Sequence, residues 1–309
     1  MFRTLAKTKD LDYKTWLKYR KLGIGGSDAG AICGLNPYVS PIAVYLDKTS
    51  DEIIMKDNEA MRQGRDLEQY VADRFTEVTG KRVRRDNRIL QNVENPFMFA
   101  NVDRMIVGES AGLECKTASP YSSAHWEDGH IPEHYQLQCH HYMAVTGAKE
   151  WYIAVVILGK DFKFAKIERD EEIIQSLVSI ERDFWNNYVL KKEMPAPDGS
   201  SIADDIINSY YKASSGKSVV LQQYEEQLSR RDELIDLIGK MEKEKREIEQ
   251  KVKVAMADAE IAITSAHRIT WKSYSSARID TDRLKSEQPE IYSNYRKQSS
   301  SRRFIVDAA

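Results

Sequence analysis

The run WYIAVVIL, residues 151–158, constrains the fold of this chain more than any other segment. All eight of its side chains are apolar and four are β-branched, which is typical of a strand buried on both faces. The segment FKFAKIE, residues 162–168, follows shortly after and is expected to be its hairpin partner. The chain is therefore expected to build a sheet that contains a buried strand.

Helical and extended patterns precede and follow this strand. Apolar residues recur every three or four positions in the segments predicted as helices, whereas the segments predicted as strands are rich in strand formers. A short GESAG connection predicts a tight turn. The predicted elements are helices over residues 12–21, 64–80, 133–147 and 171–190, strands within 81–90, 97–107 and 113–117, and a hairpin between Ile106 and Leu113.

The stretch GIGGSDAGAICG, residues 23–34, places five glycines around Ser27 and Asp28. The glycines end the preceding helix, Ser27 is expected to cap the next one, and Ser40 with Pro41 repeats the start signal. Free N–H groups at such helix starts suit an anion, so a nucleotide-binding enzyme is one hypothesis. That hypothesis rests on the glycines alone, because the stretch lacks the Lys-Ser/Thr of a P-loop and follows no predicted strand.

The hairpin NVDRMIVGESAGLECKT carries the most informative chemistry. Side chains two apart on a strand share a face, so Glu114 and Lys116 project together, and the turn brings Asp103 alongside them. Two carboxylates beside a lysine are suited to a hard divalent cation and an attacking water. Taken alone, the same spacing also fits a surface hairpin with an ordinary salt bridge.

Five histidines between Pro120 and Gly147 favour a rival hypothesis, a zinc site. The segment has no HExxH motif, and adjacent histidines on a helix point about 100° apart. Histidines on an aromatic-rich helix and loop explain the pattern without metal. The residues are His125, His130, His134, His140 and His141.

The chain resembles the PD-(D/E)xK nucleases, and within them the phage lambda exonuclease and YqaJ-type viral recombinase family. Five loose motifs in the family's order carry this resemblance, which covers roughly residues 12–190. One departure is the valine before Asp103, where the signature has a proline that the family often lacks. The motifs are Arg20 seven residues before Ser27 in GIGGSDAG, GRDLE with Glu68, NVDR with Asp103, LECK with Glu114 and Lys116, and HYQLQCHHY with Gln136 and Gln138.

The resemblance implies a metal site on the hairpin. Asp103 and Glu114 would be metal ligands, the Cys115 carbonyl would contribute between them, and Glu68 would complete the carboxylate set. Oxygen ligands of this kind suit Mg²⁺, with Mn²⁺ as a substitute, whereas zinc sites use histidine or thiolate. The cofactor expected from the resemblance is therefore Mg²⁺.

The resemblance also implies roles for the remaining motif residues. Lys116 would position or activate the attacking water and steady the developing negative charge. Gln138, in preference to Gln136, would orient the scissile phosphate or the water. Arg20 and Ser27 would form the pocket for the terminal 5' phosphate, so the glycine turn would make the enzyme begin at a DNA end.

The segment KRVRRDNR, residues 81–88, is the best local candidate for a DNA-binding patch. Arg84 and Arg85 are the expected phosphate contacts, although alternation along a strand would leave half of the basic residues on a solvated face. The whole chain carries a formal net charge of only -2, so a polyanion has to be bound by such a local patch.

The fold and activity that the resemblance implies are specific. The fold is α+β, a restriction-endonuclease-like core with a central mixed β-sheet flanked by helices. The activity is Mg²⁺-dependent 5'-to-3' digestion of one strand of linear double-stranded DNA, which exposes a 3' strand for a phage-type single-strand annealing protein. A homo-oligomer, with a ring trimer as the first expectation, is also implied. The alternatives are an endonuclease or single-strand nuclease of the same fold, and a non-catalytic DNA-binding assembly protein.

A break in composition divides the chain into two predicted parts. The break MPAPDGSS ends a predicted nuclease core, residues 1–198, and residues 218–309 form a predicted appendage for oligomerisation, DNA or partner contact. The appendage begins with a long charged helix, residues 219–258, that packs on its own domain or forms an intermolecular coiled coil, and RITWKSY and RRFIV suggest two strands.

Three widely spaced cysteines and the absence of a membrane-spanning apolar run lead us to expect a cytoplasmic protein.

Overall fold

The computed structural model describes residues 1–9, 11–52, 58–297 and 301–307. The chain divides into two compact units, Met1–Tyr211 and Lys212–Ala309. The first unit extends beyond the predicted core boundary at residue 198, because helix α7 (Ser201–Tyr210) contacts α3 (Pro41–Thr49).

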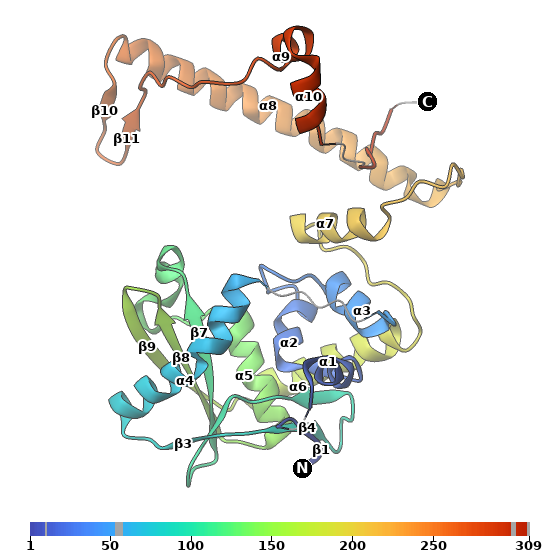
Figure 1. Cartoon of the computed structure of the whole chain (residues 1–309), viewed down its shortest axis with the longest axis vertical. Coiled ribbons are helices and arrows are strands. Elements are labelled where there is room, and N and C mark those ends of the chain that lie inside the picture. The colour runs from blue at the N-terminus through green and yellow to red at the C-terminus, as the bar shows by residue number, and fades with distance from the viewer. Residues whose placement is uncertain (10, 53–57, 298–300, 308–309) are drawn as a thin grey trace. The chain divides into compact units, whose positions relative to one another are not determined.

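A five-stranded mixed sheet is the centre of the first unit (Figure 1). The third and fourth strands in its order run parallel, and every other neighbouring pair is antiparallel. The α+β class with a central mixed sheet is therefore confirmed, as is the hairpin between Ile106 and Leu113. The strand order is β3 (Val83–Arg85), β6 (Arg104–Ile106), β7 (Ala111–Ala118), β8 (Glu150–Ile157) and β9 (Asp161–Glu168).

Strand β8 is buried on both faces, as its sequence predicts. Its odd-numbered residues from Trp151 to Ile157 join the core beneath α5 (Glu133–Thr146). Its even-numbered residues, Tyr152, Ala154 and Val156, join the core beneath α4 (Glu59–Thr79). The sheet is thus covered by a helix on each side, so any polar side chain of the neighbouring β7 must project into one of these two interfaces.

A smaller four-stranded sheet lies beside the first and contains two strands that sequence patterns did not indicate. The segment KRVRRDNRIL, expected as one extended stretch, divides at Asp86 and Asn87 between β3 of the large sheet and β4 of the small one. The strand order is β1 (Phe2–Lys7), β4 (Arg88–Asn92), β5 (Met98–Ala100) and β2 (Ile24–Gly25), with β2 parallel to β5.

The helices around the glycine turn confirm most of the predicted start and stop signals. Asp12 caps α1 (Tyr13–Lys21), and Ser40 caps α3 by accepting from the Ala43 N–H. The expectation that Ser27 caps the next helix is wrong. Gly25, two residues before Ser27, is the N-cap of helix α2 (Gly26–Ile32), and the Asp28 carboxylate accepts the Gly25 N–H. The Ser27 hydroxyl is therefore free to face another partner.

The rest of the first unit follows the predicted pattern closely. Helix α6 (Glu171–Phe184) continues into a π-helical turn, η2 (Trp185–Val189), so the helix predicted over residues 171–190 is present. The broken 3₁₀ segment η1 (Pro120–Gly129) connects β7 to α5.

The second unit is built around the long helix α8 (Glu225–Met256), which confirms the predicted charged helix (Figure 1). One of the two expected strands is present, since β11 (Arg268–Thr270) pairs antiparallel with β10 (Ile261–Ile263). The other is wrong, because RRFIV forms no strand in its described residues. The remaining elements are η3 (Gln222–Tyr224), α9 (Thr281–Glu287) and α10 (Pro289–Tyr295). Across the described segments, no helix has the length and apolar character needed to cross a membrane.

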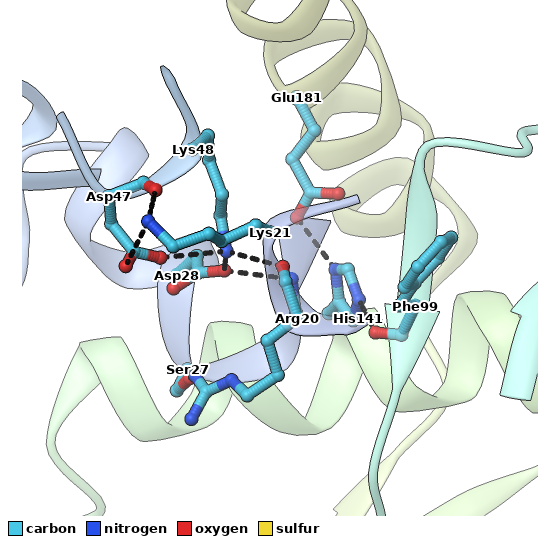
Figure 2. A network of polar contacts seen from close by, with 10 residues as sticks. Arg20, Lys21, Ser27, Asp28, Asp47, Lys48, Phe99, His141 and Glu181 are labelled. Carbon is cyan, nitrogen blue, oxygen red and sulfur yellow. Dashed lines mark hydrogen bonds and ion pairs between the residues drawn. The ribbon is translucent and has the colours of Figure 1, made fainter. Parts of the chain in front are cut away.

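A buried histidine–carboxylate pair joins α5, α6 and the small sheet. His141 Nδ1 lies 2.8 Å from Glu181 Oε1, and Nε2 lies 2.8 Å from the Phe99 carbonyl oxygen, with both side chains inaccessible to solvent (Figure 2). Burial alone would lower the pKa of His141, but the Glu181 carboxylate and these hydrogen bonds raise it; burial raises the pKa of Glu181 more than His141 lowers it. Both shifts favour a proton held in the folded protein.

This pair predicts that stability falls with increasing pH. A group whose pKa is raised by folding stabilises the folded protein fully at pH values below its unfolded-state pKa. That contribution is lost as the pH rises through the folded-state pKa. We expect the free energy of unfolding to fall through this pair as the pH rises above about 6.5, the ordinary pKa of histidine. Chemical denaturation across that range should show a smaller pH dependence in His141→Gln. An unchanged dependence in His141→Gln would contradict the assignment, and His267→Gln, at an exposed position, is the matched control.

Candidate active site

Three predicted site residues meet on the α5 side of strand β7. The Lys116 ammonium lies 2.6 Å from Glu114 Oε1 and donates to Gln138 Oε1 over 3.1 Å. The Gln138 amide nitrogen in turn donates to Glu114 Oε1 over 2.7 Å. The period-two prediction that Glu114 and Lys116 share a face is thus confirmed, and α5 supplies the third member. Neither Glu114 nor Gln138 is more than 5% exposed, whereas the Lys116 side chain is 19% exposed, so the triangle is open to solvent mainly at the lysine.

Asp103 lies directly before β6, and a hydrogen bond fixes its side chain to β7, the strand of Glu114 and Lys116. Its Oδ2 accepts the Cys115 backbone N–H over 2.8 Å. Burial, followed by the negative charges of Glu114 and Glu68, raises the pKa of Asp103 well above its ordinary value. The carboxylates are therefore close enough to disfavour each other's charge in the absence of a cation.

Glu68 is held on the opposite, α4 side of the sheet by two arginines. Arg104, which is almost fully buried, pairs with Glu68 Oε1 and also donates to the Asp103 carbonyl and to Gln69. Arg85 donates to the same Glu68 oxygen over 2.8 Å. The structure therefore places Arg85, predicted as a phosphate contact, in an ion pair beside the site.

The donor set fits a hard divalent cation. Glu114 Oε2 is buried and has no hydrogen-bond partner, and the raised pKa of Asp103 marks a site that lacks positive charge. Burial, followed by the charges of Asp103 and Glu114, also raises the pKa of the Cys115 thiol, so its backbone carbonyl is the better donor to such an ion. Over the described residues, no three Asp, Glu, His or Cys side chains are already arranged as metal ligands.

Two tyrosines complete the environment of Lys116 and Gln138, and sequence reasoning did not find them. The Lys116 ammonium lies 4.5 Å from the centre of the Tyr135 ring, and Gln138 donates to the Tyr142 hydroxyl over 2.8 Å. Both tyrosines sit three or four residues from Gln138 on α5. That helical spacing was the available signal, but it became informative only once β7 was known to face α5.

The second predicted cluster lies at the glycine turn. Arg20 Nη2 donates to the Ser27 hydroxyl over 2.8 Å (Figure 2). The Arg20 guanidinium also lies 4.9 Å from the Trp16 ring centre. The structure thus brings Arg20 and Ser27 together across the turn, although they come from different helices. A guanidinium beside a hydroxyl at an accessible position is suited to bind a phosphate group.

The remaining predicted residues lie apart from both clusters. Gln136 donates to the Ile131 carbonyl, and Arg84 is exposed on β3. Of the five histidines, His141 uses both ring nitrogens within the core, and His130 bonds the His125 carbonyl. The described histidines do not form the zinc site of the rival hypothesis.

Glycines in the turn allow α2 to pack directly on α5. A Cβ atom at Gly26 would lie 2.6 Å from the Tyr142 ring, and one at Gly30 would lie 2.8 Å from the His134 Cα. The turn is therefore rich in glycine partly because two helix backbones approach closely there. The same contact holds the Arg20–Ser27 cluster beside the helix that carries Gln138.

Comparisons with known proteins agree with this architecture. The crystal structure of LHK-Exo in complex with dAMP matches with a TM-score of 0.50 and 19% identity, over 58% of this chain and 93% of that chain. A second structure of LHK-Exo, an alkaline exonuclease from Laribacter hongkongensis, matches with a TM-score of 0.48 and 18% identity over the same shares. The first of these likenesses places the mixed sheet and its helices in a lambda-exonuclease-like fold.

Sequence similarity then gives the family. Residues 15–149 match the YqaJ-like viral recombinase domain. The uncharacterized protein YqaJ of Bacillus subtilis (strain 168) is 40% identical over 307 residues, which is 98% of this chain and 96% of that protein. The chain belongs to the YqaJ family.

Gly30→Ala should destabilise the protein by about 1–3 kcal/mol, because the added methyl group meets backbone atoms of α5 that cannot move aside. Gly64→Ala is the matched control. A Cβ atom at Gly64 would lie 3.7 Å from Thr117 Oγ1, which is an ordinary contact. Alanine is also favourable in the interior of a helix such as α4. Thermal unfolding of both variants tests the packing, and equal melting temperatures would contradict it.

Proposed function

We propose that this protein is a Mg²⁺-dependent exonuclease that digests one strand of linear double-stranded DNA in the 5'-to-3' direction. The observation that carries the proposal is the buried Glu114–Lys116–Gln138 triangle, in which one carboxylate oxygen lacks a partner. Membership in the YqaJ-like viral recombinase family and the likeness in fold to an exonuclease support it.

Asp103, Glu114 and the Cys115 carbonyl are the groups that would hold the cation, with Glu68 as a further ligand. Bound Mg²⁺ would supply an acidified water and neutralise charge on the phosphate undergoing attack. Glu68 would first have to exchange part of its contact with Arg85 and Arg104 for the metal. Of the two arginines, Arg85 is the more exposed, so its contact with Glu68 is the easier to break.

Lys116 and Gln138 are placed to act on the water and the scissile phosphate. The Lys116 ammonium has a fixed direction because Glu114, Gln138 and the Tyr135 ring all surround it. A preorganised positive charge of this kind stabilises developing negative charge without reorganisation. Gln138 bonds Glu114, Lys116 and Tyr142, so its amide has a fixed direction and would orient the scissile phosphate or the attacking water.

Arg20 and Ser27 would bind the 5' phosphate and so restrict the enzyme to DNA ends. Their contact lies on helices α1 and α2, and α2 packs on α5, which links the end-binding cluster to the catalytic triangle. A terminal phosphate would replace the bond between Arg20 and Ser27 with two charge-assisted bonds.

The resemblance also suggests partners. We propose that the protein acts on double-stranded DNA ends as a homo-oligomer, a ring trimer being the first candidate, and that it delivers 3' strands to a single-strand annealing protein. The second unit is the candidate surface for assembly or for that partner. An endonuclease or single-strand nuclease of the same fold, and a non-catalytic DNA-binding assembly protein, are the alternatives that the first experiment distinguishes.

The first experiment compares three substrates: linear duplex with a 5' phosphate, the same duplex with a 5' hydroxyl, and closed circular duplex. We expect Mg²⁺-dependent release of nucleotides from the phosphorylated linear duplex, slower release from the hydroxyl form, and none from the circle. Chelation with EDTA should stop digestion and Mn²⁺ should restore it, because oxygen ligands accept either ion. Cleavage of the circle at a comparable rate would favour an endonuclease. Inactivity on all three, also with Mn²⁺, would favour the assembly protein.

Lys116→Ala should lower turnover by about 10²-fold or more while DNA binding in EDTA changes little, because the ammonium stabilises charge that develops during reaction. Single-turnover digestion and fluorescence anisotropy measure the two effects. Lys166→Ala is the matched control, since Lys166 forms an exposed ion pair with Glu168 on β9. Retained turnover in Lys116→Ala would place the catalytic site elsewhere.

A further inference from the structure

Lys48 is a buried charged residue that the mechanism above does not use. It lies in the last turn of α3, on the same face as Val44 and Tyr45, which belong to an apolar core. Its side chain is only 1% exposed. A lysine at such a position is costly unless partners satisfy its charge and its hydrogen bonds, so the partners show what it does.

The ammonium of Lys48 joins both sides of the Arg20–Ser27 cluster. Figure 2 shows it between Asp28 and the backbone of Arg20: it lies 2.7 Å from Asp28 Oδ2 and donates to the Arg20 carbonyl over 3.0 Å. Asp28 directly follows Ser27, and its Oδ2 also accepts the Gly25 N–H over 2.9 Å. One ammonium therefore connects the end of α1 to the first turn of α2.

A second lysine makes the reciprocal contact. Lys21, at the end of α1, donates to the Asp47 carbonyl over 2.5 Å and to the Ser50 carbonyl over 3.1 Å. Each helix therefore provides a lysine that bonds carbonyl groups at the C-terminal end of the other, where helix carbonyls lack internal partners. These contacts fix the ends of α1 and α3 against each other and leave the Arg20 side chain directed at Ser27 (Figure 2).

The charges around Asp28 affect whether a second anion, such as a phosphate, can bind beside Ser27. Burial alone would raise the pKa of Asp28, but the positive charges of Lys48 and Arg20 outweigh it and hold the pKa below its ordinary value. Asp28 is therefore an anion one residue from Ser27. Lys48 forms the direct ion pair with Asp28, whereas the Arg20 guanidinium bonds the Ser27 hydroxyl and stays available to a second anion.

Stability alone does not explain Lys48. Replacing a buried ion pair by apolar residues of similar volume is often neutral or stabilising, so an ion pair that joins two binding residues is better explained by the position it imposes.

We propose that Lys48 is a positioning residue for recognition of the DNA 5' phosphate: it touches no substrate, but its bond to the Arg20 carbonyl sets the separation of Arg20 from Ser27. This inference rests on the proposed function of that cluster. It assigns the discrimination between phosphorylated and unphosphorylated ends to a residue 28 positions away from Arg20 in the sequence.

Binding in EDTA, where no digestion occurs, tests the proposal. Fluorescence anisotropy with blunt duplexes that carry a 5' phosphate or a 5' hydroxyl gives the ratio of the two dissociation constants. Lys48→Met should lower the preference for the phosphate by about tenfold, comparable to Arg20→Ala, because a displaced guanidinium loses roughly one charge-assisted bond. Lys166→Met is the matched control and should keep the wild-type ratio. An unchanged ratio in folded Lys48→Met would overturn the proposal.

The double variant Lys48→Gln with Asp28→Asn separates position from charge and avoids a lone buried carboxylate. The pair stays polar and neutral, while the shorter glutamine withdraws from the Arg20 carbonyl. The preference for the 5' phosphate should remain as low as in Lys48→Met. Recovery of the wild-type preference would overturn the proposal and assign the effect to the charge of Asp28. This variant also replaces Lys48→Met if the latter does not fold. A wild-type protein that fails to distinguish the two duplexes would instead reject the phosphate pocket itself, and the role of Lys48 with it.

Discussion

Burial of strand β8 on both faces is the constraint on which the rest of the first unit depends. Because its side chains alternate between two cores, the sheet needs α4 on one side and α5 on the other. The adjacent parallel strand β7 inherits the same environment. Its polar residues Glu114 and Lys116 therefore meet α5 at a place where water is largely excluded, and Gln138 is the residue that α5 presents there.

The electrostatics of the site follow from this burial. Carboxylates that would be ordinary on a surface raise the pKa of Asp103 when they are enclosed together, and only part of the excess charge is met by Lys116 and the arginines. A divalent cation would satisfy the remainder, including the unpartnered oxygen of Glu114. The same principle operates at the glycine turn, where Lys48 and Arg20 hold Asp28 ionised.

The two clusters are mechanically connected by the contact of α2 with α5. Gly26 and Gly30 let these helices approach more closely than side chains would permit, next to Tyr142 and His134. Tyr142 accepts a hydrogen bond from Gln138, so the helix that carries Ser27 packs against a direct partner of the Glu114–Lys116–Gln138 triangle. The two clusters thus share one support.

The sequence by itself determined the features that depend on local pattern: the buried strand, the shared face of Glu114 and Lys116, the hairpin with Asp103, and the helix cap at Ser40. The order of the motifs was enough to indicate the family. Tertiary structure alone decided the partners of those residues. Arg104, Tyr135 and Lys48 became visible only when strands and helices distant in sequence were packed together, and Ser27 proved to bond Arg20, while Gly25 is the N-cap of α2. The physical reason is that a hydrogen bond or ion pair across a fold is set by packing, which leaves no periodic trace in the chain.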